Sequence, residues 1–131
     1  MLDVYLIEED RLLVGRPKGI LDASLARRIV EFVEIKEAEI EQGFNRFCDL
    51  TRLEGINLTS NDVESLAARR SAYNPNLIRV KSAFLAPHLL DLAVVALYQI
   101  LLQSSRIEVR VFRRLEEAAE WLGVSPEGLK L

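Results

Sequence analysis

Short apolar runs that alternate with longer amphipathic stretches constrain the fold of this chain more than any single residue does. The runs have the composition of β-strands, and the stretches between them show the helical spacing of apolar residues. Strands that alternate with helices are typical of a sheet covered by helices. The runs occupy residues 4–8, 12–16, 47–51, 78–85 and 107–112. Their order, β-β-α-β-α-β-α-β-α, predicts an α/β fold with a mixed sheet of about five strands.

The first two runs are predicted to pair as an antiparallel hairpin, because only the polar residues 9–11 separate them. Pro87 is placed in the first turn of a helix, and Gly123 is placed to end another. Irregular connections are predicted around Gly19 and after residue 51. The predicted helices span 22 or 24 to 43, 61–73, 87–104 and 115–123.

The chain of 131 residues fits a single domain, 1–131, and half of its residues are hydrophobic, which suffices for one core. The tail, 125–131, is predicted to fray. Cys48 is the only cysteine, so we expect no disulfide, and its apolar run predicts a buried, unreactive thiol. Together with the lack of a hydrophobic segment at the amino end, this predicts a cytoplasmic protein.

The formal net charge of −3, from 17 basic and 20 acidic residues, gives no support for nucleic-acid binding, which usually needs a basic stripe. The nearest approach to such a stripe is formed by Arg69, Arg70, Arg79 and Lys81. We expect a solvated face here, and the alternative is an anion site.

Residues 89–102 are almost continuously apolar, although too short for a membrane span, which needs roughly 20 residues. A helix that is apolar all round is normally buried all round, whereas a helix on a two-layer domain should have one face in water. The excess predicts a homo-oligomer, with a dimer favoured, or else a covering neighbour within the chain. The candidate self-association surface is Leu92, Val95 and Leu102.

The sequence shows no catalytic machinery. The glycine-rich motifs that bind dinucleotides and nucleoside triphosphates are missing, as is the nucleophile elbow of hydrolases. Carboxylate pairs such as Glu37 and Glu41 are expected on solvent faces, without the desolvation that acid–base chemistry needs. His88, the only histidine, has no partner at metal-binding spacing. We therefore predict no enzyme, no catalytic residue, no metal and no cofactor.

The connection from Asp49 to Asp62 is the segment most suited to function, because it follows the carboxyl end of a strand and leads into a helix. The amino end of that helix offers unpaired amides to an anion, so Ser60 and Thr59 are candidate phospho-acceptor or anion-site residues. The alternative is simple capping, by Thr59 with Asp62 or by Asn61 with Glu64. The candidate loop surface comprises Asp49, Thr51, Asn57 and Asn61.

The element order, the strand end Phe-Cys-Asp-Leu-Thr at 47–51 and the helix start at Thr59 and Ser60 together resemble the STAS domain family, the fold of bacterial anti-sigma-factor antagonists. The closing segment, 109–123, looks like that of an antagonist-like branch of uncharacterised bacterial proteins. In phosphorylated members a partner kinase modifies the second of two hydroxyl residues, which implies Ser60 here. The family has an acidic residue and a glycine beside them, where this chain has Asn57 or Leu58 and Asn61.

Two functional hypotheses follow. The first is a non-enzymatic cytoplasmic regulatory or scaffolding domain that contacts a protein partner through residues 51–62 and is open to phospho-regulation. The alternative is a small-molecule or lipid-binding protein that uses an apolar pocket at the sheet edge. A continuous apolar cavity between the sheet and the helix at 89–102 would favour the alternative.

Overall fold

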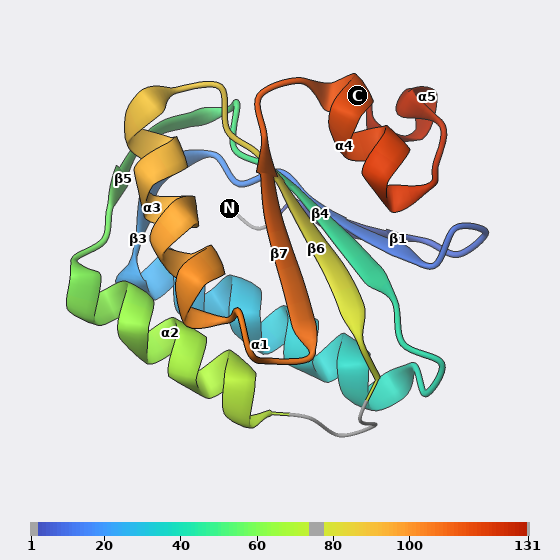
Figure 1. Ribbon diagram of the computed structural model, residues 1–131, viewed down its shortest axis with the longest axis horizontal. Coiled ribbons are helices and arrows are strands. Elements are labelled where there is room, and N and C mark those ends of the chain that lie inside the picture. The colour runs from blue at the N-terminus through green and yellow to red at the C-terminus, as the bar shows by residue number, and fades with distance from the viewer. Residues whose placement is uncertain (1–2, 74–77, 131) are drawn as a thin grey trace.

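The computed structural model describes residues 3–73 and 78–130. Its main sheet has five strands in the order β1-β2-β4-β6-β7 (Figure 1). β1 pairs antiparallel with β2, and β2, β4, β6 and β7 are parallel neighbours, so the predicted mixed sheet with its opening hairpin is confirmed. The strands are β1 (Val4–Ile7), β2 (Leu12–Gly15), β4 (Asn45–Asp49), β6 (Val80–Leu85) and β7 (Ile107–Phe112).

Helices cover both faces of this sheet (Figure 1). The Asp22 side chain caps the first helix by accepting from the Leu25 amide at 2.9 Å. Gly123, in the left-handed region at φ 74°, ends the fourth, as predicted. One face carries α1 (Ala23–Glu39), α2 (Ser60–Ala72) and α3 (Leu89–Leu101), and the other carries α4 (Leu115–Leu122) and α5 (Pro126–Leu129).

A second, two-stranded sheet occupies the segments that the sequence indicated as irregular. β3 (Gly19–Asp22) pairs in parallel with β5 (Leu53–Asn57), with a register shift after Gly19. Leu21 and Ile56 from this pair pack against the core on the side of α1–α3. The β3–β5 pair therefore forms part of the hydrophobic core on that side of the main sheet.

Two predicted ends were wrong. α3 begins at Leu89 after His88 in the N-cap position, so Pro87 precedes the helix instead of opening its first turn. The tail does not fray over its described part: α5 forms, and Leu129 is fully buried and accepts a hydrogen bond from Arg16 through its carbonyl. Leu131 lies outside the described residues. No helix within residues 3–73 and 78–130 is long and apolar enough to cross a bilayer.

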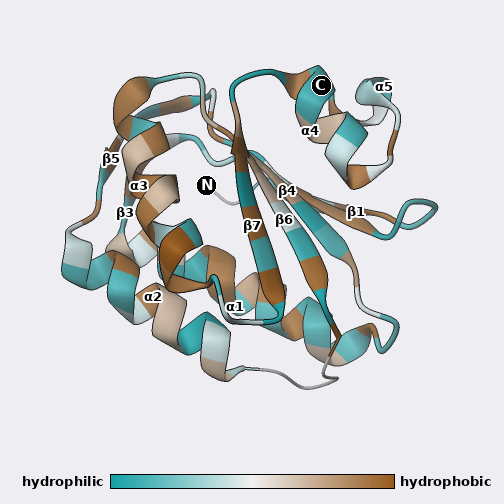
Figure 2. Cartoon of the chain, in the orientation of Figure 1, coloured by the Kyte–Doolittle hydropathy of each residue, from teal (hydrophilic) through white to brown (hydrophobic). Residues whose placement is uncertain are grey.

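The placement of the predicted self-association surface on α3 was also wrong. Val95 and Leu102 are buried, and Leu92 packs against the same core, because this side of α3 faces the sheet and α2. The helix is apolar along most of its length (Figure 2). The large apolar side chains that α3 exposes are different ones and lie at its two ends: Leu89, Leu90, Ile100 and Leu101.

Candidate functional site

A cavity of about 160 Å³ lies between the sheet and the helices α1, α2 and α3; we call it the sheet–helix cavity. Its walls are almost entirely apolar. The helices contribute Ile29, Val33 and Val94, among others, and each of these side chains is only half-buried. The described fold therefore leaves apolar surface lining a space that no side chain fills.

The cavity follows from the sizes of the residues that alternate along the sheet. Successive side chains of a strand point to opposite faces. On the face toward α4 and α5 the central strands present a close-packed set that includes Val14, Phe47 and Leu85. On the face toward α1–α3 the central positions include Gly15, Cys48 and Ser82. Because these side chains are small, space remains beside them where a typical interior would be filled.

One end of the cavity is charged. Arg46 and Arg70 border it there, together with Ser82 and Tyr98. Arg46 and Ser82 are register partners in β4 and β6, and Arg70 comes from the last turn of α2. The cavity thus combines apolar walls with polar groups that come from four elements, β4, β6, α2 and α3, and gather at one end.

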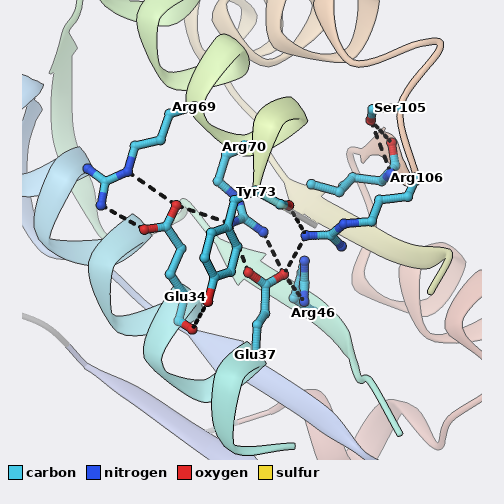
Figure 3. Close-up of polar contacts among 9 residues, drawn as sticks. Glu34, Glu37, Arg46, Arg69, Arg70, Tyr73, Ser105 and Arg106 are labelled. Atoms are coloured by element: carbon cyan, nitrogen blue, oxygen red, sulfur yellow. Dashed lines mark hydrogen bonds and ion pairs between the residues drawn. The ribbon is translucent and has the colours of Figure 1, made fainter. Parts of the chain in front are cut away.

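The arginines converge on one buried carboxylate (Figure 3). Glu37 of α1 accepts two hydrogen bonds from Arg70, at 2.9 and 2.6 Å. Arg46 and Arg106 each place an Nη2 atom 3.1 Å from Glu37 Oε2. We call these four residues the Glu37 cluster. The arginines come from β4, α2 and the turn before β7, so the cluster ties α1 to three other parts of the fold.

A second carboxylate lies at the solvent side of this cluster. Glu34, one turn before Glu37, accepts two hydrogen bonds from Arg69, at 3.2 and 2.7 Å, and lies 3.5 Å from Arg70. The side chain of Arg69 is more than one-third exposed, so this outer pair is screened by water. The ion pairs of the Glu37 cluster are buried, so water does not screen them in this way.

Burial and charge act in opposite directions on the groups of the Glu37 cluster. Burial alone would raise the pKa of Glu37, but Arg70, Arg46 and Arg106 hold it below its usual value. Burial lowers the pKa of Arg46 to about 10, despite its attraction to Glu37. Although burial also acts against the charge of Arg70, its hydrogen bonds to Glu37 raise the pKa of Arg70. Of the two arginines that border the cavity, Arg46 is therefore the one for which Glu37 compensates less of the cost of burying its charge.

Tyr98 and Cys48 are the other titratable groups that line the cavity. Burial raises the pKa of the Tyr98 hydroxyl, opposed by the positive charges of Arg70 and Arg46. Burial, with a smaller effect from Asp49, raises the pKa of Cys48 to about 12. Both groups are neutral at pH 7, and the thiol is no nucleophile.

The helix start singled out by the sequence is a capping box. The Thr59 hydroxyl accepts from the Asp62 amide at 3.1 Å, and the Asp62 carboxylate accepts from the Thr59 amide at 2.9 Å. Ser60 is exposed in the first position of α2. Thr51, Asn57 and Asn61 are exposed as well, at different points around this connection.

Asp49 is not part of the loop surface, and that prediction was wrong. It is buried, with its Oδ2 atom 2.7 Å from Arg16 Nη1, and its Oδ1 atom accepts from the Thr51 amide and hydroxyl. Because β4 ends at Asp49 with its side chain on the face of α4 and α5, the carboxylate points into the protein.

The four basic residues from 69 to 81 do not share one solvated face. Arg70 is 3% exposed and belongs to the Glu37 cluster, whereas Arg79 is exposed and Lys81 donates to the Trp121 carbonyl of α4. Sequence reasoning also missed Glu37, expected in solvent, and Arg46. An arginine next to the apolar run 47–51 was the available signal, since a charge in a buried strand requires a partner.

The described residues contain no group of three or more His, Cys, Asp or Glu side chains that could hold a metal ion. His88 is exposed at the start of α3. The site that the structure offers is therefore the sheet–helix cavity with its cationic end.

Comparison with known proteins identifies the fold. The chain is similar to the crystal structure of an uncharacterized protein of the DUF3478 family, with a SpoIIAA-like fold, from Shewanella loihica PV-4. The TM-score is 0.58 at 17% sequence identity, over 93% of this chain and 92% of the other. No protein-family model and no curated protein sequence matches the chain. The predicted STAS-like fold is thereby confirmed, since the SpoIIAA-like fold is a STAS-like fold.

Proposed function

We propose that this chain, a domain with the SpoIIAA-like fold, is a non-enzymatic binding protein that holds a small apolar molecule in the sheet–helix cavity. The observation that supports this function is the cavity itself, because several of its apolar lining residues stay half-buried while the opposite face of the same sheet is close-packed. From the sequence, a domain that contacts a protein partner was the first hypothesis, and a small-molecule or lipid-binding protein was the alternative. A cavity between α3 and the sheet favours this alternative.

The size of the cavity limits the ligand. Its volume of about 160 Å³ is close to that of engineered apolar cavities that take up benzene. The apolar part of the ligand then has about six carbon atoms. Burial of that part would remove both its own surface and the cavity walls from water, which is the main source of affinity for such a site.

Titration with hexan-1-ol, followed by ¹H–¹⁵N NMR, tests this function. We expect saturable shifts at residues lining the cavity, with Val33 and Val94 on two different helices among them. Cys48→Leu extends a side chain into the cavity and should weaken binding by about tenfold or more. Ala83→Leu enlarges a side chain on the opposite face and should leave the affinity unchanged if the fold is retained. Absence of saturable shifts in the wild type would refute the proposal.

A second candidate function rests on the start of α2. Ser60 is exposed there, and the SpoIIAA-like fold supports the hypothesis of a phospho-regulated contact with a protein partner. A phosphate on Ser60 would add about −1.5 to −2 charges beside Asp62. Capture of partners from the native cytoplasm with wild type and Ser60→Asp tests it: a partner gained or lost with the substitution supports the contact, and identical capture opposes it.

The cytoplasmic location and the homodimer stay proposals. For the homodimer, the candidate surface consists of the exposed leucines Leu89, Leu90 and Leu101 of α3, because the residues expected from the sequence face the core. Analytical ultracentrifugation of the wild type and of Leu90→Glu would test it.

A further inference from the structure

We propose that the ligand of the sheet–helix cavity is an amphipathic monocarboxylate, whose carboxylate is bound by Arg46 and Arg70 while its hydrocarbon part lies between the sheet and α1–α3. This inference rests on the proposed function and specifies the chemistry of its ligand. The Glu37 cluster carries an excess of positive charge, and two of its three cations line the cavity.

The Glu37 cluster contains more positive than negative charge. Three guanidinium groups, from Arg46, Arg70 and Arg106, surround the single carboxylate of Glu37, and none of the four side chains is more than 11% exposed. Glu34 compensates part of this excess from the solvent side, but it is already paired with Arg69. The sequence from 74 to 77, next to the cluster in the chain, contains no ionisable side chain. Buried charges normally occur in matched pairs, so the excess favours an added anion.

The unbalanced charge faces the cavity. Arg46 and Arg70 line it, whereas Glu37 and Arg106 do not. Arg46 is 9% exposed, and its Nε atom has no hydrogen-bond partner among the described residues. Its guanidinium group also lies over the Phe44 ring, with Cζ 4.6 Å from the centroid. The cavity end therefore offers a positioned donor and a neutral hydroxyl from Tyr98 to an anionic group.

The apolar walls decide which class of anion fits. A small inorganic anion would leave the half-buried apolar side chains uncovered, and a neutral hydrocarbon would leave the excess charge unpaired. A carboxylate matches the planar donor geometry of a guanidinium group, and a chain of about six carbons matches the cavity volume.

Three probes separate this inference from the proposed function: hexanoate, hexan-1-ol and acetate. Dissociation constants from NMR titrations of the wild type should be at least about tenfold lower for hexanoate than for hexan-1-ol, because charged hydrogen bonds are added. Acetate, which lacks the hydrocarbon chain, should bind more weakly than hexanoate by about tenfold or more. Equal affinities for hexanoate and hexan-1-ol would overturn the carboxylate inference while keeping the apolar site. Binding of none of the probes would refute the proposed function as well.

Substitutions locate the carboxylate. Arg46→Met keeps an apolar side chain of similar length and should remove most of the preference for hexanoate over hexan-1-ol. Arg79→Met removes an exposed arginine outside the cluster and should leave that preference unchanged. If Arg46→Met does not fold, Tyr98→Phe, which removes only a hydroxyl, should still reduce the preference. A full preference retained in a folded Arg46→Met protein would overturn the assignment.

Discussion

Two buried arginine–carboxylate sites lie on opposite faces of the same sheet, and they differ in their balance of charge. Arg16 and Asp49 form a pair at 2.7 Å, with one cation and one anion. Arg16 also donates to the Leu129 carbonyl and to the Tyr5 hydroxyl, and Thr51 donates twice to Asp49. This matched pair fixes α5 against the end of β4 in a face that is otherwise close-packed.

The Glu37 cluster has three cations around one anion and borders a cavity. An unpartnered Nε atom does not distinguish the two sites, because Arg16 and Arg46 both have one among the described residues. The number of charges and the adjoining cavity do distinguish them. A balanced pair completes a structure, whereas an excess of cations beside an unfilled apolar space is suited to receive an anionic ligand.

Loss of the single anion of the cluster, Glu37, should have the largest effect on stability. Glu37→Gln leaves three buried guanidinium groups without their shared carboxylate and should lower the free energy of unfolding by about 3–5 kcal/mol. Urea denaturation at pH 7 measures this. The control is Glu41→Gln, at an exposed position after the same helix, which should change stability by less than about 0.5 kcal/mol.

Loss of one cation should separate the two sites. Arg16→Met leaves Asp49 as an unpaired buried charge and should cost about 3–5 kcal/mol, whereas Arg46→Met leaves Glu37 with two other arginines and should cost about 1 kcal/mol or less. The same denaturation measurement compares them. Equal losses would show that Arg46 is as necessary to the fold as Arg16, and the idea of an excess cation would fail.

Enlarged side chains should separate the two faces of the sheet. Ala83→Leu overfills the close-packed face and should cost about 1–3 kcal/mol, while Cys48→Leu fills part of the cavity and should be near neutral or stabilising. Thermal unfolding of both variants gives the comparison. A similar loss in both would mean that the cavity has no room for added methyl groups.

Lowering the pH should produce the smallest change in stability. The pKa of Glu37 lies below its usual value of 4.5 in the folded protein, so its ionised form adds stability that is fully present above pH 4.5. This part is lost as the pH falls through the lower, folded pKa. The stability difference between wild type and Glu37→Gln should therefore shrink between pH 7 and pH 3. A constant difference over that range would contradict the assigned direction.

Strong periodic elements were predictable from the sequence. The last strand, Ile107–Phe112, was placed with its observed bounds, and Gly123 was placed as a helix end, because each signal is local. β3 and β5 were missed, since each is short, contains glycine and pairs only with the other. Their strand conformation depends on a contact between distant segments, which local propensity does not encode.

The candidate site was less predictable for the same reason. Glu37 lies on the charged stripe of α1, where spacing predicts solvent, but Arg70 from 33 residues later covers it. The cavity depends on the combined sizes of Gly15, Cys48 and Ser82 in three neighbouring strands. This shortage of side-chain volume can be recognised only when the strand order and the facing helices are known.

The melting temperature with and without hexanoate tests the central claim most directly, because a ligand stabilises the folded protein by an amount that rises with the logarithm of its concentration relative to its dissociation constant. At a concentration ten times the dissociation constant, hexanoate should raise the melting temperature of the wild type by about 5 °C. Hexan-1-ol at the same concentration should raise it much less, and Arg46→Met should respond to both probes alike. No rise with hexanoate, or an equal rise with both probes in the wild type, would contradict the account of an apolar cavity with a cationic end.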